Sequence, residues 1–154
     1  MRMKKIFLFL IFAILLACSP TPQPIDYGHE ECSFCKMTIV SQQFAAEIVT
    51  NKSKAFKYDA IECMLQDQQE NVALHLTCDY LNAGNLIDAT KATYLVSKQI
   101  ESPMGGNLAA FSSLEEAKKI QAEKGGDIYD WEGIQKRFNS GHSTPNHNDN
   151  MHEH

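Results

Sequence analysis

The sequence predicts an α+β domain composed of two related ββαβ units. Two short segments rich in β-branched and apolar residues precede a helical pattern and a further strand, and this order occurs in both halves. The clearest strand is 72–80, where apolar and polar residues alternate as in a half-buried strand. The halves share little residue identity, so the duplicated unit is predicted from the order of the elements alone.

The first half is predicted to contain a hairpin, a helix and a strand. Segments 36–40 and 44–49 are rich in β-branched and apolar residues, and a polar turn precedes "AFKYD". Asp59 is expected to cap a helix from Ala60 to about Glu70, with its apolar residues on one face. Strand 72–80 then completes the first unit.

The second half is expected to begin after a turn at "NAGN", residues 82–85. Ser112 and Glu115, three residues apart, resemble a capping box that opens a helix ending at the glycines 125–126. The other expected elements are strands at 92–96, 108–111 and 128–129 and a final helical segment at 131–138. This order repeats that of the first half.

The first seventeen residues predict a lipoprotein export signal. Basic residues precede an apolar run, Ile6 to Leu16, that is too short for a stable membrane span. The ending "LLAC" resembles a bacterial lipobox, which implies that Cys18 carries the lipid; an ordinary signal peptide is the alternative. The expected organisation is therefore signal 1–17, lipid anchor and tether 18–28, folded domain 29–138 and a disordered His-rich tail 139–154.

The expected mature chain is acidic. Without the three basic residues of the signal, 11 Lys and Arg stand against 19 Asp and Glu, a formal charge of −8. This charge excludes nucleic acid as a partner, because nucleic-acid binding depends on Lys and Arg that release counterions. Four cysteines remain after Cys18, an even number that in an exported protein can also indicate disulfides.

The segment "CSFCKM" brings Cys32, Cys35 and Met37 within six positions. If this segment is extended, Cys35 and Met37 point to the same side, so a thiolate and a thioether can bind one ion. Cu(I) favours these soft ligands, whereas zinc seldom binds methionine. The alternative for Met37 is a core position beside Ile39.

Two further cysteines have different expected environments. Cys63 lies off the apolar face of its predicted helix and one turn from its start, where the helix dipole favours a thiolate. Cys78 continues the apolar alternation of strand 72–80, which predicts a buried, inert thiol. A disulfide between Cys63 and Cys78 is the competing interpretation.

Met104 lies in the turn "SPMGG", where no core packing pattern requires a methionine, so a ligand role is favoured over a loop residue without a function. The tail adds His142, His147, His152 and His154, which can bind metal loosely or simply be solvated.

Several segments together resemble one known family, the NosL-type lipoproteins, which are accessory proteins of nitrous oxide reductase. The resemblance is carried by Cys18 and by "CSFCKM", "FAAEIV", "AFKYDAIECM", "YLVSKQIESPMGGNLAAFSSLEEA" and "KGGDIYDW", in the expected order over most of 30–132. The family pattern usually has Cys-Gly-Met where this chain has Cys35, Lys36 and Met37.

The resemblance implies a function and a set of ligands. It implies one Cu(I), bound on the extracytoplasmic side of a bacterial membrane and delivered to nitrous oxide reductase or its ABC-transporter maturation complex, without catalysis. It assigns Cys35, Met37 and Met104 as ligands, while Cys32 and Cys63 are additional candidates. The family fold of two ββαβ units agrees with the element order above.

Two other functions fit parts of the sulfur pattern. A thiol–disulfide oxidoreductase would use Cys32 and Cys35 and would need neither Met37 nor Met104. A structural zinc site would combine Cys32 and Cys35 with Cys63 and Cys78, which requires the strand thiol to turn toward the metal.

Overall fold

The computed structural model describes residues 19–140. Its elements, in chain order, are β1 (Ala46–Thr50), β2 (Ala55–Tyr58), α2 (Ile61–Gln66), β3 (Val72–Asp79), β4 (Asn82–Asp88), β5 (Thr93–Val96), β6 (Leu108–Phe111), α3 (Leu114–Lys124), β7 (Asp127–Tyr129) and α4 (Trp131–Ser140). Within the described residues, no helix combines the length and hydrophobicity needed to span a membrane.

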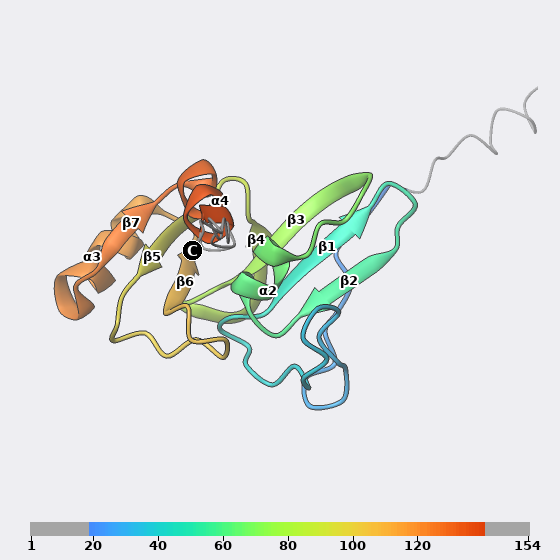
Figure 1. Cartoon of the computed structure of the whole chain (residues 1–154), viewed down its shortest axis with the longest axis horizontal. Helices are drawn as coiled ribbons and strands as arrows, with labels where there is room; N and C mark the ends of the chain where they lie inside the picture. The colour runs from blue at the N-terminus through green and yellow to red at the C-terminus, as the bar shows by residue number, and fades with distance from the viewer. Residues whose placement is uncertain (1–18, 141–154) are drawn as a thin grey trace, which may run out of the picture.

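The strands form two antiparallel sheets, with the orders β2-β1-β3-β4 and β6-β5-β7. In each sheet the first strand of the unit is central, and the second and third strands flank it. This shared topology confirms the predicted pair of ββαβ units. Figure 1 shows the two sheets beside each other, with α2 and α4 between them and α3 on the far side of the smaller sheet.

The strand β4 was not predicted, because its polar start resembles a turn. Asp79 pairs with Asn82, so the chain reverses at Tyr80 and Leu81, and the "NAGN" segment belongs to a strand rather than to a connection. β4 is the edge of its sheet, and residues 82–85 are exposed. An edge strand tolerates polar residues and glycine, because one side of it faces solvent.

The predicted strand at 36–40 is also wrong. Among the described residues 19–140, its only pairing is an isolated bridge between Glu31 and Thr38. Lys36 has a φ of 65°, which interrupts an extended backbone. The actual hairpin joins β1 and β2 in the register Ala46 to Tyr58, across the polar turn predicted from the sequence. Segment 36–40, which precedes this hairpin, is part of a loop.

The helix α2 is shorter than predicted, and Asp59 does not cap it. The Asp59 carboxylate accepts the Val40 N–H at 3.1 Å, and the N-cap residue Ala60 has no side-chain cap. The helix ends at Gln66 because Asp67 is extended and accepts a hydrogen bond from the Tyr58 hydroxyl at 2.9 Å. Tertiary hydrogen bonds thus override the local helical pattern.

The second unit follows the sequence more closely. The cap of α3 is Ser113, whose hydroxyl accepts the Glu116 N–H at 3.2 Å, one residue later than the predicted Ser112 and Glu115. The helix ends before Gly125, which has a φ of 66° that favours glycine. The strand at 127–129 and the helix from Trp131 lie where the sequence predicted them.

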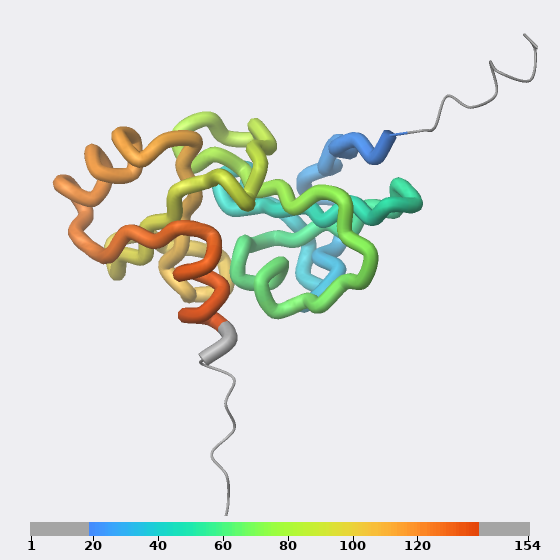
Figure 2. Tube along the Cα trace, turned by 90° about the horizontal axis from the view of Figure 1, so that it is seen from above, coloured from blue at the N-terminus to red at the C-terminus, as the bar shows by residue number. Residues whose placement is uncertain are grey.

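The core joins the two units into one domain. Its larger cluster includes Ile48 and Tyr58 of the first sheet together with Tyr94 and Leu108 of the second. The Trp131 ring contacts His75 of β3 and Tyr94 of β5, with ring centroids 5.3 and 6.1 Å away. The amino-terminal segment packs along the first sheet (Figure 2). There the Gln23 N–H donates to the Glu47 carboxylate at 3.0 Å.

Candidate metal centre

The "CSFCKM" segment forms a tight loop attached to the edge strand β2. The Lys36 N–H donates to the Cys32 carbonyl at 3.1 Å, and the Cys32 N–H donates to the Met37 carbonyl at 2.8 Å. Ser33 anchors this loop, because its N–H donates to the Lys57 carbonyl at 2.7 Å and its hydroxyl accepts the Lys57 N–H at 3.1 Å. The loop therefore holds both cysteines close to the end of β2, where α2 begins.

Three thiols converge where this loop meets α2. The Sγ atoms of Cys32, Cys35 and Cys63 all lie within 4.8 Å of one another. Cys32 and Cys63 are fully buried, whereas Cys35 is partly exposed. The cluster is thus enclosed by the core on one side and open to solvent at Cys35.

The pKa values of the two buried thiols of this cluster, Cys32 and Cys63, are shifted in opposite directions. Burial acts to raise the pKa of Cys32, but hydrogen bonds from the backbone N–H groups of Asp59, Cys35 and Phe34 hold that pKa below its ordinary value. The pKa of Cys63 is raised, by burial and then by the neighbouring thiols of Cys32 and Cys35. Cys32 is therefore the better site for a thiolate, and Cys63 is protonated without a metal.

Two sequence-based expectations about this cluster are wrong. Cys63 was expected off the apolar face as a dipole-stabilised thiolate, but the loop packs over α2 and buries it, which raises its pKa. Cys35 and Met37 were expected on one side of an extended segment, but the positive φ of Lys36 turns the chain between them. Met37 is 53% exposed, which also excludes the alternative core position.

Cys78 lies apart from the cluster. It is fully buried in β3, as predicted, and its Sγ lies 3.5 Å from the Tyr27 hydroxyl. Burial raises its pKa. All four cysteines of the described residues are free, and Cys63 groups with Cys32 and Cys35 rather than with Cys78. The arrangement therefore supports neither the Cys63–Cys78 disulfide nor the four-cysteine zinc site.

Met104 lies in a turn that packs against α2 through Glu62. The Ser102 hydroxyl donates to the buried Glu62 carboxylate, and a Cβ at Gly106 would lie 2.6 Å from the Glu62 side chain. Met104 itself is 38% exposed. Because Glu62 precedes Cys63, one short helix contacts the methionine turn and also supplies a thiol of the cluster.

Glu62 is a residue of this region that sequence reasoning missed. Burial raises the pKa of its carboxyl group, and its Oε2 atom has no hydrogen-bond partner within residues 19–140. The signal in the sequence was an acidic residue inside the short apolar segment "AIECML". The remaining candidate residues, Cys18, His142, His147, His152 and His154, lie outside the described residues.

Two small antiparallel sheets with three thiols converging at one partly open point define a class of small α+β proteins able to hold a metal ion through sulfur. Within that class, the chain belongs to the NosL family, whose family model matches residues 24–138. This match confirms the resemblance seen in the sequence.

Two known proteins show what the chain is similar to. It is 34% identical over 71 residues to the copper-binding lipoprotein NosL of Stutzerimonas stutzeri, a match that covers 46% of this chain and 37% of that relative. Its fold is similar to the crystal structure of the copper chaperone NosL from Shewanella denitrificans, with a TM-score of 0.64 and 21% identity over 73% of this chain and 94% of the other. The similarity to the Shewanella denitrificans structure shows that the two chains share a fold.

Proposed function

We propose that this protein is a lipid-anchored Cu(I) chaperone of the extracytoplasmic side of a bacterial membrane. It delivers copper for assembly of the copper centres of nitrous oxide reductase, either directly or through an ABC-transporter maturation complex, and performs no catalysis. The observation that carries this proposal is the convergence of three thiol Sγ atoms within 4.8 Å. Family membership and the copper-binding names of the relatives support it.

The geometry suits a soft ion that must be released again. Thiolates and thioethers select Cu(I) over harder ions, and Cys35 is accessible while Cys32 and Cys63 hold the ion from the buried side. The exposed thioethers of Met37 and Met104 complete the proposed ligand set. Because Cys63 is protonated without metal, binding releases its proton.

The remaining parts of the chain have proposed roles in anchoring and supply. Cys18 carries the lipid after removal of 1–17, 18–28 is the anchor and tether, and 29–138 is the copper-binding domain. His142, His147, His152 and His154 of the segment 139–154 are auxiliary metal ligands.

One observation favours a second candidate, a thiol–disulfide oxidoreductase, because Cys32 has a lowered pKa and lies next to Cys35. A catalytic thiol must, however, reach its substrate, and Cys32 is fully buried. The burial of the activated thiol makes a metal ligand the better assignment.

The test is a Cu(I) titration of the reduced protein without residues 1–18, in competition with a Cu(I) chelator. We expect about one tightly bound ion with a sulfur ligand shell in X-ray absorption. Cys35→Ser should abolish tight binding, whereas the matched variant Cys78→Ser should keep it and lose stability. A nitrogen and oxygen shell only, or equal copper loss in both variants, would refute the copper site. A measurable Cys32–Cys35 disulfide potential without copper binding would support the oxidoreductase instead.

A further inference from the structure

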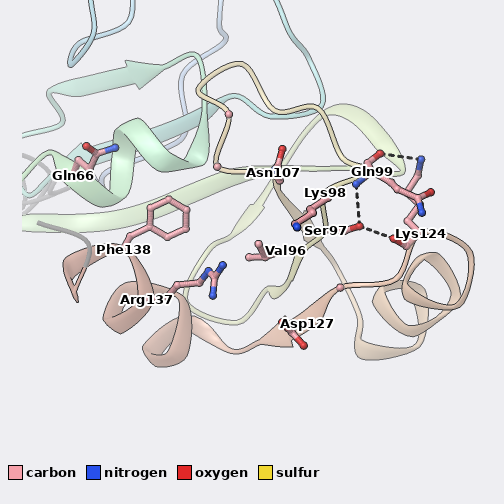
Figure 3. A pocket seen from close by; sticks show the side chains of 13 residues that line it. Gln66, Val96, Ser97, Lys98, Gln99, Asn107, Lys124, Asp127, Arg137 and Phe138 are labelled. Atoms are coloured by element: carbon pink, nitrogen blue, oxygen red, sulfur yellow. Dashed lines mark hydrogen bonds between the residues drawn. The ribbon is translucent and has the colours of Figure 1, made fainter.

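A cavity of about 860 Å³ opens directly beside the methionine turn. Gly105 and Gly106, which follow Met104 in the chain, form part of its lining. Val96 and Phe138 contribute apolar surface to it, and Lys98 and Arg137 contribute positive charge. Figure 3 shows these side chains arranged around the cavity, with Arg137 and Phe138 coming from α4.

The cavity is basic although the protein is acidic. Three cationic residues, Lys98, Lys124 and Arg137, line it together with one acidic residue, Asp127. The side chains of Lys98 and Arg137 point toward the middle of the cavity, whereas the Asp127 carboxylate points away (Figure 3). The cavity is therefore a local positive region on a chain with a formal charge of −5.

Among the residues that the structure describes, no acidic side chain forms an ion pair with either of the two inward-pointing cations. Within residues 19–140, Lys98 forms no ion pair. Arg137 donates to the Tyr129 hydroxyl at 3.1 Å and lies over the Tyr129 ring, 5.5 Å from its centroid, which orients the guanidinium without compensating its charge. An oriented guanidinium is a bidentate donor for a carboxylate.

We propose that this cavity is the docking site for an acidic surface segment of the copper acceptor. The inference rests on the proposed function, because it assumes that copper passes to another protein. The cavity is larger than a single inorganic anion needs, and its two cations are accompanied by apolar surface from Val96 and Phe138. An extended polypeptide segment with carboxylates beside an apolar side chain matches this combination of charge and surface.

Docking at this cavity brings the acceptor to the copper-binding side. A segment seated there lies against Gly105 and Gly106, the two residues that follow the exposed Met104 in the chain. Transfer is then a ligand exchange: a sulfur or imidazole nitrogen of the acceptor bonds to Cu(I), and a sulfur of this protein leaves. The copper remains Cu(I), so no oxidant or reductant is required. The cavity therefore controls encounter and orientation and leaves copper affinity unchanged.

The test measures copper transfer from the full-length protein, in non-ionic detergent, at several salt concentrations. The acceptors are copper-free nitrous oxide reductase and, in a separate assay, the ABC-transporter maturation complex. Lys98→Glu combined with Arg137→Glu should slow transfer at low salt by at least about tenfold and remove its salt dependence. Lys98→Gln with Arg137→Gln should give an intermediate rate and checks that the effect follows charge. The matched control is Lys118→Glu with Lys119→Glu, which reverses two exposed cations on α3 and should transfer at the wild-type rate.

Chelator competition on the same samples separates this inference from the proposed function. A wild type that binds no Cu(I) would refute both. A wild type that holds Cu(I) but transfers none to either acceptor would refute both proposed acceptors together with the docking site. Wild-type transfer rates in the cavity variants would overturn the docking site alone. A wild-type dimer that dissociates in the charge-reversed variant would assign the cavity to a second copy of this chain and would also overturn the proposal.

Discussion

Lys36 lies in the left-handed region of backbone conformation, with a φ of 65°, between two of the proposed copper ligands. Most residues other than glycine avoid this region, at a cost of roughly 1–2 kcal/mol. The position is the one where the NosL family pattern usually has glycine, in Cys-Gly-Met. The glycine preference therefore has a structural reason, because the chain must turn between Cys35 and Met37 while Cys32 stays buried beneath the loop.

Substitutions at Lys36 test whether the left-handed turn explains the glycine of the family pattern. Lys36→Gly should stay within about 1 kcal/mol of wild type, because relief of the backbone cost is offset by the greater entropy of glycine in the unfolded chain. Lys36→Val should lose a further ~1–2 kcal/mol and weaken Cu(I) binding, since a branched side chain resists positive φ. Both variants lose the same hydrogen bond from Lys36 Nζ to the Ser33 carbonyl, so they are matched. Urea denaturation of the reduced apo protein is the measurement, and equal stability would contradict the strained turn.

Met104→Leu separates a ligand from a packing residue. Leucine keeps roughly the volume and apolar character of methionine, so the apo protein should change by less than ~1.5 kcal/mol, while loss of the thioether should weaken Cu(I) binding. Met37→Leu should show the same contrast more weakly. Met64→Leu is the control, because Met64 is a buried core methionine. Chelator competition and thermal denaturation measure the two effects, and copper affinity equal to wild type in Met104→Leu would remove the "SPMGG" turn from the site.

At the scale of single elements, α3 depends on a cap that the sequence misplaced by one residue. Ser113→Ala removes the acceptor of the Glu116 N–H and should destabilise the protein by about 1 kcal/mol without affecting copper binding. Ser112→Ala is the control: within residues 19–140, the exposed Ser112 hydroxyl donates only to the half-buried Glu116 carboxylate and caps no backbone N–H, so the expected loss is below ~0.5 kcal/mol. Urea denaturation distinguishes the two variants, and a larger loss for Ser112→Ala would restore the capping box first predicted.

At the scale of the whole molecule, Trp131 joins the two sheets through His75 and Tyr94. Burial lowers the pKa of His75, although the Asp88 charge acts in the opposite direction. Below the unfolded value of ~6.5, the unfolded chain binds a proton at His75 that the folded protein does not. The contribution of His75 to stability is therefore fully present above pH ~6.5 and is lost as pH falls through the lower folded pKa.

His75→Phe should remove this pH dependence while keeping an aromatic ring against Trp131. Buried carboxyl groups such as Glu47, whose pKa burial raises, change stability with the opposite sign as pH falls. The prediction therefore concerns the difference between the two proteins: between pH 7 and 5, the free energy of unfolding of wild type should fall relative to that of the variant. Urea denaturation across this range measures it, and parallel pH profiles would show that His75 titrates normally in the folded state.

The sequence by itself determined the features that depend on local pattern and composition. The alternation of strand 72–80 predicted both β3 and the buried state of Cys78, and the glycines at 125–126 predicted the end of α3. The repeated order of elements predicted the two units that the sheet topology confirms. The motifs predicted the family, and they also supplied the candidate sulfur residues of "CSFCKM" and "SPMGG".

The tertiary structure alone decided how these residues combine. The periodicity of the sequence does not predict that the Cys63 thiol lies beside the thiols of Cys32 and Cys35. The distances between these thiols depend on the hydrogen bonds by which Ser33 holds the loop against Lys57 of β2. The same holds for the basic cavity, which gathers Lys98 and Arg137 from distant segments. Local pattern determines which face of an element is buried, but only long-range hydrogen bonding and packing determine which side chains of different elements come together.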